Sequence, residues 1–194
     1  MHMKILVLNG HPDAMSLCAA LAERYCAGAR ASGYEVMQIN VRDLQFDPVL
    51  HAGYRVPQAL EEDLCMAQEK IRQCDHLVIV TPLWWAGLPG LFKGFIDRTF
   101  VRGFSHAFNP VKKVPEKLLK GRSATVIYTQ GAPFFYSFLF VGDAFWKMLR
   151  KAILEFAGFS PVRRFCFANI KPGQDHAIYA SHLDRAYRLG VQGK

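Results

Sequence analysis

Three segments of the chain combine glycine, histidine, hydroxyl and aromatic side chains in patterns that suit binding of an anion and a flat ring. The first, residues 9–16, reads Asn-Gly-His-Pro-Asp-Ala-Met-Ser and precedes a helical pattern. Ser16 is a preferred N-cap residue, and the free N–H groups of a helix's first turn attract phosphate. His11 either donates to that anion or caps its own loop, and the residues alone leave both readings open.

The second segment, residues 81–90, reads Thr-Pro-Leu-Trp-Trp-Ala-Gly-Leu-Pro-Gly and carries two adjacent tryptophans. It lies between an apolar run, residues 77–80, and a helical spacing of apolar residues. Consecutive side chains of an extended turn point in different directions, so Trp84 and Trp85 cannot both simply be core residues. We expect Trp85 to face a bound ring; the alternative is that the indoles pack in the core or on a second subunit.

The third segment, residues 129–136, reads Thr-Gln-Gly-Ala-Pro-Phe-Phe-Tyr. Gly131 lets backbone N–H groups approach a ligand closely, while Thr129, Gln130 and Tyr136 offer hydrogen bonds. A phenol beside a redox-active ring can donate a proton or stabilise a developing oxyanion. The alternative for Tyr136 is an ordinary surface aromatic.

Five short apolar runs, rich in β-branched and aromatic residues, predict the strands that position these segments. Helical spacings separate the runs, and Pro57 suits the first position of one such helix. Alternating strands and helices indicate a parallel sheet covered on both faces, within a single domain of residues 1–194. Ligands bind at the carboxyl ends of parallel strands, so we expect the three segments to meet at one edge. The predicted strands are residues 4–9, 35–40, 76–81, 123–129 and 162–168.

Composition narrows the class of protein. The net charge is +8, with basic residues concentrated in 98–122, but without a recognition motif or basic helix stripe this does not favour a nucleic-acid partner. No apolar run reaches the ~18 residues of a membrane span, and no secretion signal opens the chain. The five cysteines show no disulfide framework or metal-ligand spacing. We therefore expect a cytoplasmic protein without a metal site.

Two further segments, residues 44–56 and 103–121, are long and irregular, which in compact domains usually indicates a functional or partner-binding role. Together, the three loops supply a phosphate seat, an aromatic wall and an edge of hydrogen-bond donors. Neither GxGxxG nor GxxxxGK[ST] occurs in the chain, and no pair of metal-binding carboxylates appears. A flavin therefore suits the three loops better than ATP.

These motifs resemble the flavodoxin-like NAD(P)H:quinone reductases, a family that includes DT-diaphorase, the modulator-of-drug-activity quinone reductases and the potassium-efflux ancillary flavoproteins. The specific part is Pro-Leu-Trp-Trp-Ala-Gly-Leu-Pro with Leu-Phe-Lys-Gly, residues 82–94. The resemblance implies a flavodoxin-like three-layer α/β sandwich with strand order 2-1-3-4-5. It also implies a bound FMN or FAD and a homodimer with each active site at the interface. Hydride would pass from NADH or NADPH through the flavin to a quinone-like acceptor.

Carried over by position, the resemblance makes Tyr136 and His106 the candidate catalytic residues, with Phe104 and Phe108 in the loop that presents aromatics to the substrate. The positions that it assigns to flavin binding are His11, Ser16, Leu17, Cys18, Pro82, Leu83, Trp84, Trp85, Ala86, Thr129, Gln130, Gly131, Ala132 and Tyr136.

The chain also departs from the family's pattern. The mammalian enzymes carry a histidine a turn beyond the tyrosine, whereas residues 137–142 contain none, and His106 stands in place of an aromatic hydroxyl. The mammalian C-terminal extension has no counterpart, which favours FMN over FAD. The positive charge favours NADPH as the hydride donor.

Two other functions remain open at this level. A regulatory flavoprotein would dock on a transport system or another partner, and the basic 103–121 segment would be its docking surface. A one-electron carrier of flavodoxin type is disfavoured by the basic composition and the tryptophan-rich loop.

Overall fold

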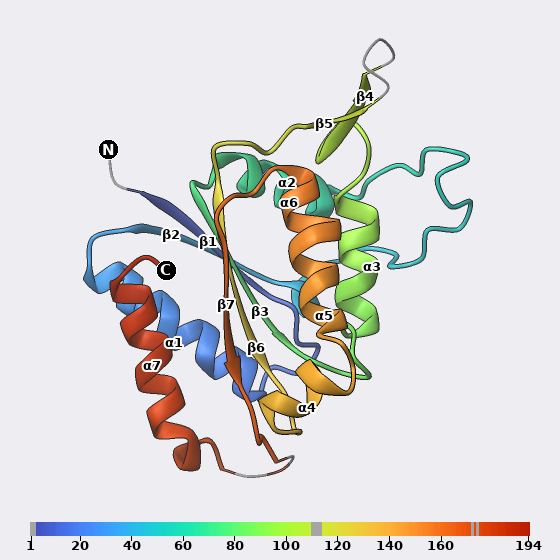
Figure 1. The fold of residues 1–194 in the computed structure, drawn as a ribbon. Helices are drawn as coiled ribbons and strands as arrows, with labels where there is room; N and C mark the ends of the chain where they lie inside the picture. Colours follow the sequence, from blue (N-terminus) through green and yellow to red (C-terminus); the bar gives the residue numbers. More distant parts are fainter. Residues whose placement is uncertain (1–2, 110–113, 172, 174) are drawn as a thin grey trace.

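A five-stranded parallel sheet forms the centre of the computed structural model, which describes residues 3–109, 114–171, 173 and 175–194 (Figure 1). Its strand order is β2-β1-β3-β6-β7, which confirms the predicted order 2-1-3-4-5. All four neighbouring pairs are parallel. The five strands are β1 (Lys4–Asn9), β2 (Glu35–Asn40), β3 (His76–Pro82), β6 (Ser123–Thr129) and β7 (Val162–Phe167).

The central strands are continuous apolar runs because helices cover both faces of the sheet. Every residue of β3 is buried. On one face lie α1 (Leu17–Ala31) and α7 (Ala180–Val191). The opposite face packs against α2 (Glu62–Gln73) and α3 (Gly90–Thr99), with the helical stretch that starts at α5 (Ala144–Lys147) beside them. These three layers confirm the predicted sandwich.

Two glycines allow α1 and α7 to pack in close contact. A Cβ atom at Gly28 would lie 2.1 Å from the carbonyl oxygen of Tyr187, and one at Gly190 would lie 2.1 Å from that of Tyr25. Any larger residue would force the helices apart. Among the described residues, no helix is long and apolar enough to cross a membrane.

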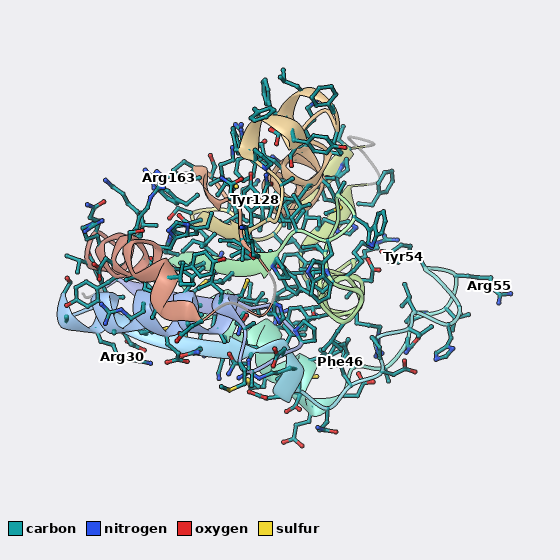
Figure 2. All side chains as sticks on the ribbon, turned by 90° about the horizontal axis from the view of Figure 1, so that it is seen from below. Arg30, Phe46, Tyr54, Arg55, Tyr128 and Arg163 are labelled. Carbon is teal, nitrogen blue, oxygen red and sulfur yellow. The ribbon has the colours of Figure 1, made fainter. Side chains whose placement is uncertain are left out.

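The helix that was expected to begin at Pro57 begins later. Its first residue is Glu62, and Glu61 occupies the N-cap position. The preceding residues stay irregular because the Arg98 side chain hydrogen-bonds the carbonyl oxygen of Ala59 and the carboxylate of Glu61. Figure 2 shows Tyr54 and Arg55 at the outer end of this connection, away from the sheet.

The 103–121 segment contains a hairpin that the sequence did not predict. Strands β4 (His106–Asn109) and β5 (Val114–Lys117) pair antiparallel and project from the body of the molecule (Figure 1). Residues 110–113, including two lysines of the expected basic cluster, lie outside the described residues.

The third segment continues into a helix that was also not predicted, α4 (Phe134–Leu139), none of whose residues is buried. The next helical stretch has three parts: α5 (Ala144–Lys147), a π-helical part (Met148–Leu154) and α6 (Glu155–Ala157). This stretch supplies buried apolar side chains to the core, among them Phe145, Trp146 and Leu149.

Candidate functional site

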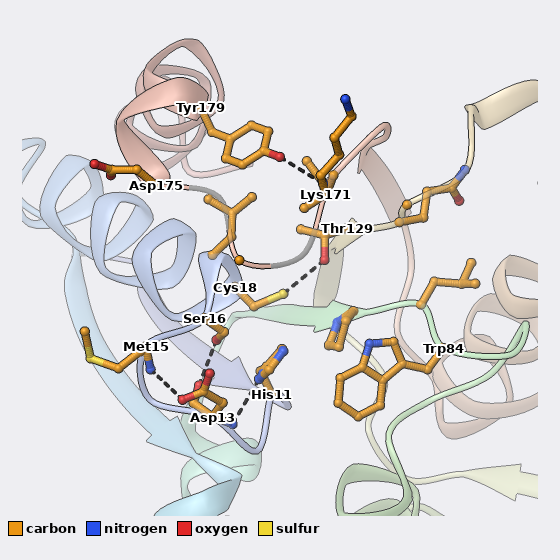
Figure 3. A pocket seen from close by; sticks show the side chains of 17 residues that line it. His11, Asp13, Met15, Ser16, Cys18, Trp84, Thr129, Lys171, Asp175 and Tyr179 are labelled. Atoms are coloured by element: carbon orange, nitrogen blue, oxygen red, sulfur yellow. Dashed lines mark hydrogen bonds between the residues drawn. The ribbon is translucent and has the colours of Figure 1, made fainter.

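The three predicted segments meet at the carboxyl ends of β1, β3 and β6, as expected for a parallel sheet. They surround a cavity of about 790 Å³, the first pocket (Figure 3). The segment that follows β7 closes its remaining side. The lining residues are His11, Asp13, Met15, Ser16, Leu17, Cys18, Pro82, Leu83, Trp84, Thr129, Gln130, Gly131, Ile170, Lys171, Gly173, Asp175 and Tyr179.

The start of α1 provides an anion seat in the first pocket. Ser16 is the N-cap, as predicted: its Oγ accepts from the amide of Ala19 at 3.2 Å and donates to the carbonyl of Asp13 at 2.8 Å. The amides of Leu17 and Cys18 have no acceptor within the helix, because a helix's first N–H groups lack one. The first turn of α1 carries no acidic residue, and the two carboxylates of the pocket lining, Asp13 and Asp175, lie outside that turn.

His11 fills one of the two roles that the sequence left open, the capping of its own loop. Its Nδ1 accepts a hydrogen bond from the amide of Asp13 at 2.9 Å, so the ring caps its own loop. Burial lowers the pKa of His11, with an opposing contribution from Asp13. A neutral ring whose Nδ1 accepts must carry its proton on Nε2. His11 therefore keeps one N–H donor for a ligand, next to the indole of Trp84, which it meets edge-on at 5.3 Å.

The tryptophan turn is strained. Backbone hydrogen bonds join Trp84 and Gly87 in both directions, at 3.1 and 2.8 Å. The two residues between them, Trp85 and Ala86, are both left-handed, with φ of 50° and 58°. This conformation costs on the order of 1 kcal/mol or more for each non-glycine residue. Strain of this kind is concentrated at functional sites in proteins.

The two indoles line different cavities. Trp84 lines the first pocket, whereas Trp85 is fully exposed and lines a second pocket of about 400 Å³. The two pockets share Leu83, Gln130 and Gly131. The second pocket is lined by Leu83, Trp85, Ala86, Gln130, Gly131, Ala132, Tyr136, Ser137, Val141, Asp143, Ala144 and Phe145.

All the predicted flavin-binding positions thus lie on the walls of one or both pockets. Their detailed contacts differ from the expectation at two positions. The side-chain amide of Gln130 is engaged within its own loop, donating to the Ala132 carbonyl at 2.9 Å and accepting from the Ser137 hydroxyl at 3.1 Å. The Cys18 thiol lies 3.3 Å from the Thr129 hydroxyl. Burial raises the pKa of Cys18 to about 12, so the thiol stays protonated.

The two predicted catalytic residues are separated within the chain. Tyr136 lines the second pocket with its side chain half exposed. His106 lies on β4, where its Nδ1 is 3.0 Å from the Ser105 hydroxyl and its ring is 5.1 Å from that of Phe156. It lines a third cavity of about 300 Å³, and neither the first nor the second pocket.

The segment after β7 is the part of the site that sequence reasoning missed. Ile170, Lys171 and Tyr179 line the first pocket, and the Lys171 amide donates to the Tyr179 hydroxyl at 2.9 Å (Figure 3). The sequence could have indicated this segment, because the fifth strand of a parallel sheet ends at the same edge as the others, so the residues after it are also expected at the site. Two acidic residues of the lining were also missed, and both carboxylates accept backbone amides of their own turns: Asp13 from Met15, and Asp175 from Ala177.

Comparison with known proteins places the chain in a family. A family model described as flavodoxin-like fold matches residues 3–189, so the chain belongs to the flavodoxin-like family. A Haemophilus influenzae protein called an uncharacterized NAD(P)H oxidoreductase is 28% identical over 134 residues, or 67% of this chain and 65% of that protein. NAD(P)H dehydrogenase (quinone) 1 of Rattus norvegicus is 25% identical over 187 residues, or 80% and 65%. The chain thus spans just under two thirds of the length of these curated relatives.

Solved structures share the fold over the whole chain. A crystal structure from Streptococcus mutans UA159 has a TM-score of 0.83 at 30% identity and covers 98% of this chain and 100% of that one. The NAD(P)H:quinone oxidoreductase from Methanothermobacter marburgensis has a TM-score of 0.81 at 22% identity, with both chains covered completely. At that identity, the second similarity concerns the fold alone.

Proposed function

We propose that the chain is a flavin-dependent NAD(P)H oxidoreductase that passes hydride from NADH or NADPH through a bound flavin to a quinone or a similar acceptor. The observation that carries the proposal is the junction of the two pockets at Leu83, Gln130 and Gly131. One pocket ends in an anion seat and the other is walled by aromatic side chains. A ring with a phosphate-bearing tail needs this combination, and the names of the two curated relatives support the reaction class.

The first pocket would hold the tail of the flavin. The amides of Leu17 and Cys18 and the Nε2–H of His11 converge on the seat at the start of α1. A single helix N-terminus provides one phosphate seat, which suits FMN better than FAD. The Cys18–Thr129 contact lies beneath the seat and ties α1 to β6.

The second pocket would hold the ring and the acceptor. The bound flavin would supply the two-electron redox chemistry. The indole of Trp85 offers a flat surface, and Gly131 lines the same pocket. A Cβ atom at Gly131 would lie 3.3 Å from the carbonyl oxygen of Ile170, so the chain packs closely there. The phenol of Tyr136 is the group that could deliver a proton.

A second copy of the chain would complete the site. Exposed apolar side chains surround the second pocket: Trp85 is fully exposed, and Phe138 and Phe140 are 54% and 72% exposed. Such a patch is typical of an interaction surface. A catalytic role for His106 would depend on such a homodimer, because His106 and Tyr136 line different cavities within one chain.

Absorbance of the purified protein and turnover test this proposal. We expect a yellow protein that releases FMN and oxidises NADPH or NADH when a quinone is added. Trp85→Ala should lower flavin affinity, and Tyr136→Phe should slow turnover while flavin stays bound. A colourless protein that takes up neither FMN nor FAD would contradict the proposal. Flavin binding without turnover, with any acceptor, would favour the regulatory role instead.

A further inference from the structure

Helix α4 has no core of its own to hold it. It comprises six residues, and none of them is buried. An isolated helix of this length is not stable in water. Nevertheless, α4 carries Tyr136 and Ser137 into the wall of the second pocket. The position of α4 must therefore come from contacts outside the helix.

Arg164 on β7 provides such a contact at the start of α4. Its guanidinium lies 5.1 Å from the centre of the Phe134 ring and 5.2 Å from the indole of Trp146 on α5. The planar guanidinium suits such stacking on aromatic faces. One side chain of the sheet thus touches α4 and the helical stretch that follows it.

The same arginine also holds the end of the α4 turn. Both carboxylate oxygens of Asp143 accept from Nη1 of Arg164, at 2.8 and 2.6 Å. The Asp143 amide in turn donates to the carbonyl of Ser137 at 3.0 Å. The hydroxyl of Ser137 donates to the side chain of Gln130 at the end of β6. A continuous path of contacts therefore runs from β7 through Asp143 to α4 and back to the sheet.

Asp143 sits in a conformation that an ordinary surface residue would avoid. Its φ is 56°, directly after Gly142 with φ of 64°. Glycine adopts this region at no steric cost, whereas aspartate does so at a cost of about 1 kcal/mol or more. The side chain is only 12% exposed, and that of Arg164 is 26% exposed. The strain at Asp143 is offset by an ion pair that solvent screens little.

We propose that the Asp143–Arg164 ion pair is a positioning device that holds α4 against the second pocket and so places the phenol of Tyr136. The assignment of a role to Tyr136 rests on the proposed function; the holding of α4 does not. Pairing also neutralises the Asp143 carboxylate, which lines the second pocket. In this proposal both residues act through Tyr136.

Hydrogen exchange and kinetics of Asp143→Asn test the proposal. Asparagine tolerates left-handed backbone and keeps the shape of the side chain, so the variant removes mainly the charge. Asp184→Asn is the matched control, because Asp184 pairs with Arg24 at 3.5 Å on the opposite face of the sheet. We expect amides 134–143 of Asp143→Asn to exchange about tenfold faster, while those of β1 stay unchanged.

Kinetic measurements distinguish a role of the ion pair in positioning Tyr136 from a role in general stability. With flavin bound, kcat should fall about tenfold in Asp143→Asn, because small displacements of a reacting group are costly. Flavin affinity should change less than about threefold, because the anion seat lies in the first pocket. Arg164→Lys keeps the charge but loses the planar stacking surface, so its exchange rates and kcat should fall between those of the wild type and Asp143→Asn.

Two results would overturn the proposal. Unchanged exchange of residues 134–143 in both variants would show that α4 is held by something else. Faster exchange with unchanged kcat would show that the position of Tyr136 is independent of the ion pair. If the wild-type protein shows no turnover at all, the proposed function fails. Hydrogen exchange of amides 134–143 still shows whether the ion pair holds α4.

Discussion

Two stretches of the chain contribute few fully buried side chains to the core, and an arginine from a core helix or strand contacts each of them. The 44–61 segment is held by Arg98 of α3, and the α4 turn, residues 130–143, is held by Arg164 of β7. Both arginines form an ion pair with a carboxylate of the segment they hold, at 2.8 Å for Arg98 and 2.6 Å for Arg164. The two anchors differ in what else the guanidinium contacts.

Arg98 binds the backbone of the 44–61 segment. Its side chain is 1% exposed, and it donates to the carbonyl oxygens of Asp47 and Ala59 as well as to Glu61. Backbone carbonyls are fixed by the path of the chain, so this anchor defines one arrangement. Arg164 instead contacts aromatic rings and one carboxylate, all of which are side chains that can rotate.

The difference suggests a division of roles between the two stretches. The 44–61 segment is part of the folded body, and loosening it should cost stability. The α4 turn borders the second pocket, and loosening it should cost function more than stability. The following predictions test this division, from the largest expected effect to the smallest.

Replacing Arg98 should destabilise the protein most. Arg98→Met leaves the Glu61 carboxylate and two carbonyl groups without their partner, and breaking a buried pair in this way costs about 3 kcal/mol. Urea unfolding measures the loss, and Arg164→Met is the matched comparison. We expect the Arg164 variant to lose less, about 2 kcal/mol, because the Arg164 side chain is 26% exposed and that of Arg98 only 1%. Equal losses in the two variants would contradict the division.

A second change tests how closely the 44–61 segment packs on α3. A Cβ atom at Gly94 would lie 2.5 Å from Cβ of Pro48 and 2.6 Å from its carbonyl oxygen. Gly94→Ala should therefore push the segment off the helix at a cost of about 2 kcal/mol. Gly90→Ala on the same helix meets nothing within 4 Å and serves as the control. A stable Gly94→Ala protein would show that the segment moves freely.

As the pH falls, protonation of His76 on β3 should destabilise the protein before the Arg98–Glu61 ion pair is weakened. Burial lowers the pKa of His76 to about 4 from 6.5, with a smaller contribution from Arg163. Between pH 6.5 and 4, His76 therefore binds a proton in the unfolded chain but not in the folded chain. This stabilisation is complete above pH 6.5 and is lost as the pH falls toward 4, by about 2 kcal/mol at pH 4.5.

The pKa of Glu61 is lowered from its usual value of 4.5, so the Arg98 anchor keeps its charge through most of the pH range in which His76 destabilises the fold. Burial alone would raise the pKa of Glu61, but hydrogen bonds from the amides of Asp47 and Glu61 and from Arg98 outweigh it and hold the pKa below 4.5. The anchor should thus weaken only below that pH. Unfolding of wild type and His76→Gln between pH 7 and 4.5 measures the first step. The stability of His76→Gln should depend much less on pH over this range. If the variant keeps the full pH dependence, a group other than His76 is responsible.

The smallest effect on stability is expected from Phe134→Ala. The Phe134 ring is 39% exposed and contributes mainly its contact with Arg164, so its loss should cost less than about 1 kcal/mol. Hydrogen exchange of α4 should nevertheless increase. Phe135→Ala is the control, since Phe135 is more exposed at 59%. A stability loss as large as that of Arg98→Met would show that α4 contributes as much to global stability as the 44–61 segment, which would contradict the division.

Local patterns predicted the parts of the molecule that local chemistry controls. The central strands β1, β3 and β6 were predictable because both of their faces are buried, so each one is an apolar run. The edge strands β2 and β7 are only partly buried. The N-cap at Ser16 was predictable because capping is local: the Ser16 side chain accepts from the amide three residues later. The pocket positions followed from the rule that parallel strands end at one edge.

The failures of prediction come from contacts between distant residues. Pro57 carries a helix-start signal, but Arg98, 39 residues after Ala59, holds the chain before Glu62 in an irregular path. Helix α4 was missed because its apolar residues run continuously and none faces the core, so no helical period appears. The separation of His106 from Tyr136 depends on a hairpin whose pairing no local pattern indicated.

The exposure of Trp85 also gives the protein a built-in optical signal. Its indole is wholly surrounded by water, whereas Trp84 is 44% exposed and Trp146 is 9% exposed. Emission from Trp85 should lie at the red end of the tryptophan range, and a ring stacked on the indole would quench it. Ligand entry into the second pocket can therefore be followed by fluorescence without any label, with Trp85→Phe as the silent reference.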